Sequence, residues 1–308
     1  MRTAVLALIV SALWGGNVVA IKYGLATVPP IWSAFWRMVI GSVTVAVWAW
    51  AEGASLRPRR DELGLLSALV GLFAVQISLL NTAVGLTSAA YAVVLLNTHP
   101  IFTNLFGHFL AGEERLTARR LVGLALSFGG MYWVVFGRPD AQFAAQPLLG
   151  NALTIVSAIL LPMRVLITRR LVQKSPATKL MFWQMAGALP VFAALGFVFE
   201  PFLLQELSWD AIAALLYQGS VVAGFCFVMW TAMLREHSAS TLSIFAFTVP
   251  FFGVFLSALI FGEPVTPRLL SGAGLVTLGI FVVTRAPSVE AQGAPESDTP
   301  KEVEEPAR

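Results

Sequence analysis

A dense group of polar side chains lies between residues 97 and 108 of a strongly apolar sequence. At 100° per residue along a helix, Asn97, Asn104 and His108 lie within an arc of about 80° that also contains Pro100, whereas His99 points elsewhere. Because a polar stripe is costly in lipid, we expect it to face the interior of a helical bundle. There it either binds a ligand or forms hydrogen bonds between helices. His99 and His108 are the side chains of this stretch that could titrate near neutral pH.

Arg37 is the most deeply placed cation of the sequence. It lies about six residues into a predicted apolar helix, which is roughly 9 Å from the nearer helix end at 1.5 Å per residue. None of the 17 Asp and Glu residues falls in the middle of a predicted span. The charge of Arg37 is therefore met by backbone carbonyls, by water or by an anionic group of a substrate, and both a substrate contact and a structural role stay open. Arg164 and Lys22 lie near the ends of predicted spans, which favours snorkelling to the interface for both.

Further polar and aromatic side chains inside apolar segments are candidates for the lining of a binding site. Aromatic rings either stack on a substrate or pack and anchor at the membrane interface, and amides either bind a ligand or bridge helices. The candidates for substrate binding are Trp14, Asn17, Arg37, Gln76, Asn97, His99, Asn104, Gln184, Gln218 and Trp230.

The sequence lacks the motifs that catalysis inside a membrane would need. It contains no HExxH zinc motif, no nucleophile elbow, no intramembrane aspartate pair and no P-loop for ATP. The one cysteine, Cys226, excludes a disulfide within the chain and is expected to be a small packing residue. We therefore expect neither an enzyme nor a bound cofactor or metal.

The elements that position these residues are apolar segments long enough to cross a bilayer. Hydrophobic residues make up 57% of the 308-residue chain and charged residues only 12%, which is about half the charge of a typical soluble domain. Apolar runs of roughly 20 residues alternate with short breaks that hold the charges, and the basic residues form no stripe for nucleic acid. The predicted spans are residues 4–24, 31–51, 63–83, 87–110, 119–137, 148–168, 180–200, 210–232, 239–261 and 269–284.

The distribution of lysine and arginine predicts the orientation of the chain. With a cytoplasmic N-terminus, 13 basic residues fall in or beside the inner loops and 3 in or beside the outer ones. By the positive-inside rule, both termini are expected in the cytoplasm, as an even number of spans also requires. Residues 285–308 are rich in Glu, Pro, Ala and Ser, which predicts a disordered cytoplasmic tail.

The two halves of the chain repeat each other at an offset of 146–150 residues. Each copy has five spans, an odd number, so the second copy enters the membrane from the opposite side, as in many secondary transporters. Gln184 stands at the position of Arg37 in the second copy. The matches are Ile9-Val10-Ser11-Ala12 with Ile155-Val156-Ser157-Ala158, Phe35-Trp36-Arg37-Met38 with Phe182-Trp183-Gln184-Met185, Thr98-x-Pro100-x-Phe102 and Gly112-Glu113 with Thr248-x-Pro250-x-Phe252 and Gly262-Glu263, and Thr117/Gly123/Gly130 with Thr266/Gly272/Gly279.

Helix-breaking residues occur at equivalent positions of the two copies. Gly16 corresponds to Pro162, and Pro100 corresponds to Pro250. Backbone groups freed at such positions can face only protein or a water-filled cavity. The paired breaks therefore either mark a binding region or bend the helices for packing.

The repeated motifs resemble those of the EamA-type drug/metabolite transporter superfamily. The resemblance covers roughly residues 4–284, and it implies a ten-helix transporter of a bacterial cytoplasmic membrane, often an exporter of amino acids or other metabolites. Leu160-Leu161 departs from the pattern, because the first copy has Trp14-Gly15 at the equivalent place. The motifs that carry the resemblance are Ser88-Ala89-Ala90, Pro100, Gly112-Glu113 and Gly123, their second copy from Ser238-Ala239 to Gly272, and Trp14-Gly15 with Arg37.

We therefore predict an all-α integral membrane protein of ten transmembrane helices in two inverted five-helix repeats, residues 1–137 and 148–284. The expected function is secondary transport, as an exporter, of small metabolites around a central cavity between the repeats. A channel or a sensor-type membrane protein without alternating access is the alternative. The expected partners are a small-molecule substrate and the lipid bilayer of the inner membrane, without nucleic acid, for a monomer or a homodimer.

Overall fold

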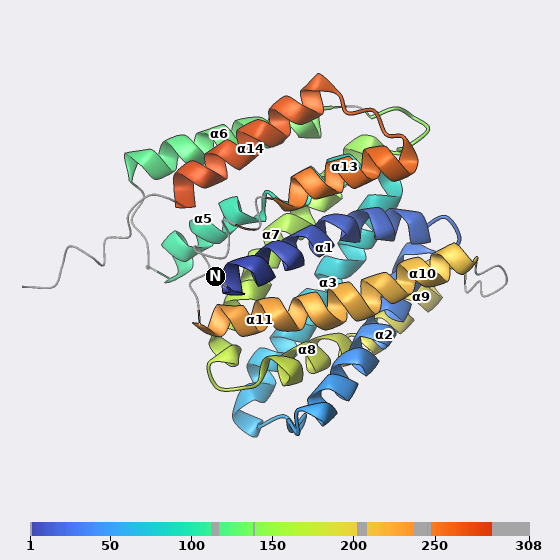
Figure 1. Cartoon of the computed structure of the whole chain (residues 1–308), viewed down its shortest axis with the longest axis vertical. Coiled ribbons are helices and arrows are strands. Elements are labelled where there is room, and N and C mark those ends of the chain that lie inside the picture. The colour runs from blue at the N-terminus through green and yellow to red at the C-terminus, as the bar shows by residue number, and fades with distance from the viewer. Residues whose placement is uncertain are drawn as a thin grey trace, which may run out of the picture.

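The computed structural model describes residues 2–111, 117–137, 139–201, 208–236, 245 and 248–284, and it contains helices but no strand in these ranges (Figure 1). The expected tail, residues 285–308, lies outside them. The helices are α1 (Arg2–Gly24), α2 (Pro30–Ala51), η1 (Arg60–Glu62), α3 (Leu63–Leu86), α4 (Ala89–Leu96), α5 (His99–Ala111), α6 (Ala118–Val135), α7 (Pro147–Val172), α8 (Ala177–Ala186), α9 (Leu189–Phe199), α10 (Trp209–Leu216), η2 (Tyr217–Cys226), α11 (Phe227–Glu236), α13 (Val249–Phe261) and α14 (Pro267–Thr284).

Six helical runs of the described chain are long and apolar enough to cross a membrane. They cover Val5–Gly24, Pro30–Ala51, Arg60–Leu86, Pro147–Val172, Ala177–Phe199 and Trp209–Arg235. Two shorter apolar helices, Val249–Phe261 and Pro267–Val283, accompany them. The prediction of an all-helical protein is thus confirmed for the described residues, and six of its helical runs could span a membrane by length and composition.

Several predicted spans are interrupted inside the bundle. The span predicted over residues 87–110 is divided, because α4 ends at Leu96 and α5 begins at His99, next to Pro100. At this break the Thr98 hydroxyl donates a 2.7 Å hydrogen bond to the Leu95 carbonyl oxygen. Other changes of helix geometry occur between α8 and α9 and at η2, which is a π-helix.

The four predicted break positions differ in what the helices do there. Pro250 lies in the first turn of α13, and Pro100 lies in the first turn of α5. Gly16 and Pro162 instead lie inside α1 and α7, and both helices continue through them. An α-helix can retain a proline when the lost backbone hydrogen bond is tolerated as a local bend.

Two pairs of glycines bring α6 and α14 into backbone contact. A Cβ atom added to Gly123 would lie 2.6 Å from the Gly279 carbonyl oxygen, and one added to Gly130 would lie 2.8 Å from the Gly272 carbonyl oxygen. No side chain could occupy these positions without separating the helices. Because Gly123 pairs with the later glycine of α14 and Gly130 with the earlier one, the two helices are antiparallel.

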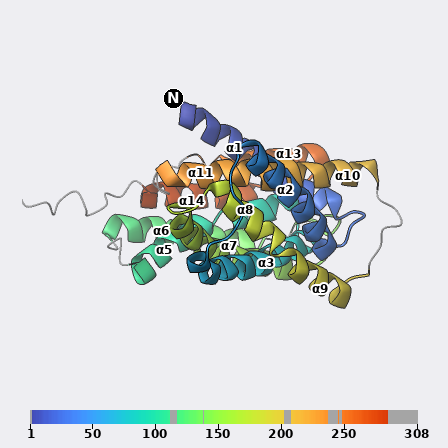
Figure 2. The same cartoon turned by 90° about the horizontal axis from the view of Figure 1, so that it is seen from below.

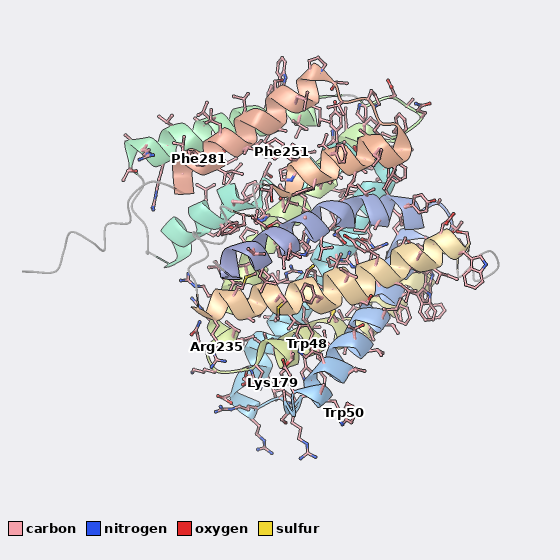
Figure 3. The ribbon with its side chains drawn as sticks, viewed as in Figure 1. Trp48, Trp50, Lys179, Arg235, Phe251 and Phe281 are labelled. Atoms are coloured by element: carbon pink, nitrogen blue, oxygen red, sulfur yellow. The ribbon has the colours of Figure 1, made fainter. Side chains whose placement is uncertain are left out.

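The remaining helices form two layers. Figures 1 and 2 show α1, α11 and α13 on one side of the molecule and the packed pair α3 and α7 on the other. Large apolar side chains cover the outside, such as Phe251 on α13 and Trp50 at the end of α2, whose side chain is 83% exposed and projects from the bundle (Figure 3). Exposed apolar surface of this extent is what a protein presents to lipid tails.

One end of the bundle, where α3 ends and α4 begins, is tied together by charged side chains. Lys22 of α1 donates hydrogen bonds to the carbonyl oxygens of Thr87 (2.7 Å) and Val84 (3.1 Å) beyond and within the last turn of α3. Glu263, just beyond α13, is 5% exposed and accepts hydrogen bonds from the Ala89 and Ala90 amides, both at 3.0 Å. We refer to this end as the α3–α4 end.

Glu263 therefore binds the N-terminus of α4, in the other half of the chain, where the helix dipole favours a negative charge. Glu200 does the same for α2, because its carboxylate accepts hydrogen bonds from the Ile31 amide (2.8 Å) and the Trp32 amide (3.1 Å). Each carboxylate belongs to the second half of the chain and each helix start to the first half. These contacts hold the halves together at this end.

At the opposite end, where α7 ends and α8 begins, a buried ion pair joins the halves. Lys179 of α8 and Glu62 of η1 are 4% and 3% exposed and approach to 2.8 Å. The Ser175 hydroxyl also donates a hydrogen bond to Glu62. We refer to this end as the α7–α8 end.

Candidate functional site

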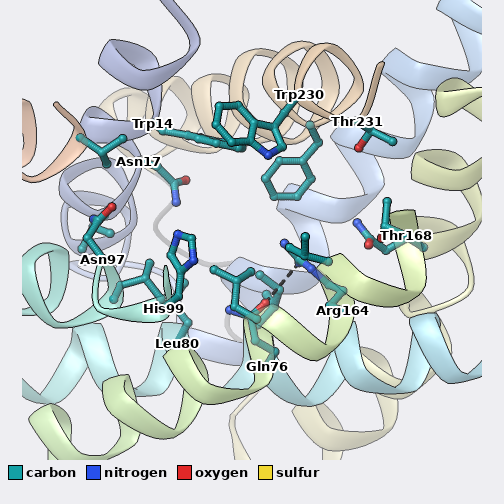
Figure 4. A pocket seen from close by; sticks show the side chains of 18 of the residues that line it. Trp14, Asn17, Gln76, Leu80, Asn97, His99, Arg164, Thr168, Trp230 and Thr231 are labelled. Atoms are coloured by element: carbon teal, nitrogen blue, oxygen red, sulfur yellow. Dashed lines mark hydrogen bonds between the residues drawn. The ribbon is translucent and has the colours of Figure 1, made fainter. Parts of the chain in front are cut away.

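A cavity of about 150 Å³ lies between the two layers of helices (Figure 4). α1, α2, α3 and the α4–α5 break contribute lining residues from the first half, and α7, α8, α11 and the start of α13 contribute them from the second half. The structure brings eight of the ten predicted candidates to this cavity. They are Trp14, Asn17, Arg37, Gln76, Asn97, His99, Gln184 and Trp230.

Arg37 reaches the cavity from α2 as a buried charge. Its side chain is 1% exposed, and its Nε and Nη1 atoms have no hydrogen-bond partner in the described part of the chain. The guanidinium carbon lies 6.0 Å from the centroid of the Phe227 ring. A cation–π contact stabilises by about 0.5–2 kcal/mol, which is less than the several kcal/mol that burial of an ion costs. The described protein groups therefore leave the charge of Arg37 largely uncompensated.

Arg164 supplies a second cation of the cavity, whereas the sequence favours snorkelling of this residue to the interface. The predicted span ended at residue 168, but α7 continues to Val172, so Arg164 lies about two turns inside the helix. Its guanidinium carbon is 5.1 Å from the centroid of Phe73 and 5.5 Å from that of Phe227. None of the described lining residues is Asp or Glu. Arg37 and Arg164 thus face one cavity without a counter-ion among the lining residues that the structure describes.

Gln76 of α3 holds Arg164 in place from the neighbouring helix. The Nη1 atom of Arg164 donates to Oε1 of Gln76 at 3.2 Å, the interaction drawn as a dashed line in Figure 4. The side-chain amide nitrogen of Gln76 in turn donates to the Ser157 hydroxyl at 2.8 Å, and this hydroxyl donates to the backbone carbonyl oxygen of Gln76 at 3.2 Å. The paired bonds to Ser157 fix the amide so that its oxygen points at the guanidinium.

Three aromatic rings form a wall of the cavity. The ring centroids of Trp14 and Trp230 are 4.8 Å apart with an interplanar angle of 54°, and Trp14 meets Phe227 edge-on at 6.3 Å. Figure 4 shows both tryptophans across the cavity from Gln76 and His99. Phe227 and Trp230 belong to the first turn of α11, directly after η2. The wall offers apolar ring surface beside the two cations.

Asn17, Asn97 and His99 form a neutral polar side of the cavity, away from Arg164 (Figure 4). The Asn97 side chain caps its own helix, because Nδ2 donates to the Val93 carbonyl oxygen at 2.8 Å. Oδ1 of Asn17 and Nδ1 of His99 are buried, and no described group hydrogen-bonds to them. The break between α4 and α5 thus brings Asn97 and His99 to the cavity, and Asn17 of α1 and His99 offer free hydrogen-bonding atoms there.

Gln184 lines the cavity from α8, at the position that corresponds to Arg37 in the repeat. Gln184 is 1% exposed, and the hydrogen bond that its side chain makes to the described residues is a weak one, with Nε2 3.7 Å from the sulfur of Met181. The two equivalent positions therefore face the same cavity, but one carries a charge and the other is neutral. The cationic character of the cavity comes from Arg37 and Arg164.

Two predicted candidates stand apart from this group. Gln218 lies in η2, fully buried outside the cavity lining, and donates a 3.0 Å hydrogen bond to the Ala20 carbonyl oxygen. It joins η2 to α1. The backbone of Asn104 and His108 is part of α5, but their side chains lie outside the described residues.

The described residues contain no group of three or more His, Cys, Asp or Glu side chains that could hold a metal ion. The side chains at the cavity can supply charge, hydrogen bonds and aromatic surface to a ligand. They line a candidate binding site between the two halves of the helical bundle.

The fold and the sequence of this chain are similar to those of known proteins. A crystal structure shares the fold with a TM-score of 0.69 and 19% sequence identity, covering 92% of this chain and 99% of the other. The uncharacterized transporter YoaV of Bacillus subtilis is 25% identical over 89% of this chain and 94% of its own length. A protein of Escherichia coli named as a probable amino-acid metabolite efflux pump is 26% identical over 91% of this chain and 94% of its own length.

The repeat found in the sequence has a direct counterpart among protein families. The model of the EamA-like transporter family matches the chain twice, over residues 1–136 and over residues 148–285. Together the two matches cover nearly the whole described structure, including every helix that lines the cavity. The chain belongs to the EamA-like transporter family.

Proposed function

We propose that the chain is a secondary transporter that exports small metabolites, such as amino acids or related compounds, by alternating access around the cavity between its two halves. The observation that carries the proposal is the cavity itself, because it is polar and charged inside an apolar bundle and is lined from both halves. Polar and charged residues inside a membrane protein usually mark a substrate pathway. The name of the Escherichia coli relative supports export of amino-acid metabolites.

The proposed scaffold has ten transmembrane helices in two inverted five-helix repeats, residues 1–137 and 148–284. Ten crossings result when the divided runs α4–α5, α8–α9 and α10–η2–α11 each count as one. The glycine contacts between α6 and α14 support the inversion. In the repeat, Gly123 corresponds to Gly272 and Gly130 to Gly279, so exchanging the halves converts each contact pair into the other. A two-fold axis in the membrane plane has this effect.

The proposed orientation in the inner membrane places both termini, and therefore the α7–α8 end, in the cytoplasm. Most lining residues of the second half, such as Thr168, Met181 and Leu234, lie toward that end. Lys22, Glu200 and Glu263 join helices at the α3–α4 end. We therefore assign this arrangement to a state in which the cavity is closed on the outside and nearer to the cytoplasm.

A resistance and retention screen tests the proposal. Cells that overproduce the protein are grown on a panel of metabolites and toxic analogues, and cells preloaded with labelled compounds are followed as they lose label. The proposal predicts raised resistance to some compounds and faster loss of the same compounds. Cells producing Arg37→Ala at equal membrane level are the control. Unchanged resistance and retention for every compound would contradict export.

A further inference from the structure

The cavity holds two cations that no lining carboxylate balances. Arg37 and Arg164 come from different halves of the chain and face the same Phe227 ring at 6.0 and 5.5 Å. Two like charges this close repel each other, so the cavity has a net electrostatic preference for a negative guest. The only side-chain hydrogen bond that either guanidinium makes to the described chain is the one to Gln76. Most of their donors are free to bind a ligand.

The aromatic wall lies beside these cations. Trp14, Phe227 and Trp230 present ring faces and edges, and a guest with an apolar body gains contact surface there. The volume of about 150 Å³ is below the roughly 300–1,000 Å³ of pockets that bind drug-sized ligands. The occupant is therefore small, with room for about one ring and a short chain.

We propose that the cavity selects a small organic anion with an aromatic or other flat apolar body, whose carboxylate lies between Arg37 and Arg164 while the body packs against Trp14, Phe227 and Trp230. This inference rests on the proposed function, which makes the cavity the substrate site, and it adds the chemical class of the substrate. It favours an anion over a zwitterion, because the ammonium group of a zwitterion would meet two arginines and no carboxylate among the described lining residues. Asn17 and His99 have the capacity to bind a neutral polar substituent of the same guest.

A series of matched probes tests the charge preference on the unmodified protein. The purified chain in nanodiscs of phosphatidylcholine is titrated with 3-phenylpropionate, its neutral amide 3-phenylpropionamide and the zwitterion phenylalanine, with tryptophan fluorescence as the readout. We expect 3-phenylpropionate to bind at least about tenfold more tightly than either of the other two, as loss of one charge-assisted contact in a buried site implies. Equal affinities, or tighter binding of the zwitterion, would overturn the proposal.

Substitutions then locate the anion. Arg37→Gln and Arg164→Gln are each expected to weaken binding of the carboxylate about tenfold or more and to leave binding of the amide nearly unchanged. Arg268→Gln is the matched control, since Arg268 also stacks on an aromatic ring, that of Trp133 at 4.8 Å, but lies outside the cavity. Where a glutamine variant does not fold, the lysine variant at the same position should retain part of the preference. A variant series that weakens amide and carboxylate equally would contradict the assignment.

Two further measurements distinguish a lipid headgroup from a free organic anion as the ligand, and distinguish the anion preference from the proposed transport. Replacing phosphatidylcholine by phosphatidylglycerol, at a salt concentration that screens the surface charge, should leave the affinity for 3-phenylpropionate unchanged. Competition would instead assign the cationic site to an anionic lipid headgroup and overturn the proposal. Saturable export of a neutral or cationic metabolite alone would overturn the anion preference but uphold transport. Selective binding of 3-phenylpropionate without any transported compound would uphold the site and contradict the proposed function.

Discussion

At the scale of single residues, the cavity depends on side chains that the fold buries without neutralising. Burial of a guanidinium costs several kcal/mol, and a ring contact returns about 0.5–2 kcal/mol of it. A structural arginine would be expected to use its donors on carbonyl or carboxylate oxygens, as Lys22 does at the end of α3. Arg37 does not do so in the described structure, which favours a role in binding over a role in packing.

The first prediction concerns Arg37 and transport. Arg37→Ala should abolish transport of a carboxylate-bearing substrate, because the free donors of Arg37 are lost, while folding and membrane insertion remain intact. Transport in proteoliposomes and the elution profile in detergent check the two parts. Normal transport, or loss of folded protein, would defeat the assignment.

The sequence identified most of the cavity because a polar residue inside an apolar segment is costly unless it has a partner or a ligand. This argument is sound for Asn17 and His99, which retain unused polar atoms. Gln218 shows that such a cost does not locate the cavity: its Nε2 bonds the Ala20 carbonyl oxygen, its Oε1 has no partner in the described chain, and the residue still lies outside the cavity lining. Arg164 is not recognisable in this way, because hydropathy places the end of a span only to within a few residues and α7 is longer than predicted.

At the scale of helices, the breaks matter more than the helices themselves. The divided segment α4–α5 brings Asn97 and His99 to the cavity, and the π-helical segment η2 precedes the turn that carries Phe227 and Trp230. π-helical segments often occur at functional sites. An apolar run predicts that a segment crosses the membrane, but it does not predict where neighbouring helices stabilise an interruption. The boundary beside Pro100 is foreseeable because proline itself favours a break, whereas the sequence of η2 carries no comparable signal.

The second prediction concerns the helix start that Glu263 binds. Glu263→Gln should lower the free energy of unfolding by about 1–3 kcal/mol, because a neutral amide offers one oxygen where a carboxylate offers two to the Ala89 and Ala90 amides. Thermal melting in detergent measures the loss.

Glu52→Gln is the control for this experiment. Glu52 is exposed at the end of α2, where its carboxylate accepts a 2.6 Å hydrogen bond from the Trp48 indole. Its substitution should change stability little, as for other exposed charges. Equal effects of the two substitutions would mean that Glu263 does not hold the halves together.

At the scale of the whole molecule, the two halves share a scaffold but differ in chemistry. The glycines of α6 and α14 pair as the proposed two-fold exchange requires, whereas Arg37 and Gln184, which stand at equivalent positions of the repeat, line the same cavity with and without a charge. The cations come one from each half but from non-equivalent helices, α2 and α7. The sequence indicated the repeat through ordered matches, yet the pairing of Arg37 with Arg164 depends on tertiary packing that no local pattern encodes.

The third prediction concerns orientation. Cysteines introduced at exposed loop positions should react with an impermeant maleimide in intact cells at Gln142 and be protected at Ser55, because these loops lie at opposite ends of the bundle. The native Cys226 is fully buried and should stay unlabelled. The reverse pattern of labelling would place the termini outside.

Counterflow in proteoliposomes tests the central claim most directly, namely that this cavity belongs to a carrier. Liposomes loaded with an unlabelled compound identified by the screen are diluted into a trace of the labelled compound, and the label inside is followed over time. The carrier mechanism predicts transient accumulation of label that saturates with concentration and is lost in Arg37→Ala. Flux that never saturates and shows no stimulation by compound on the opposite side would contradict it and indicate a channel.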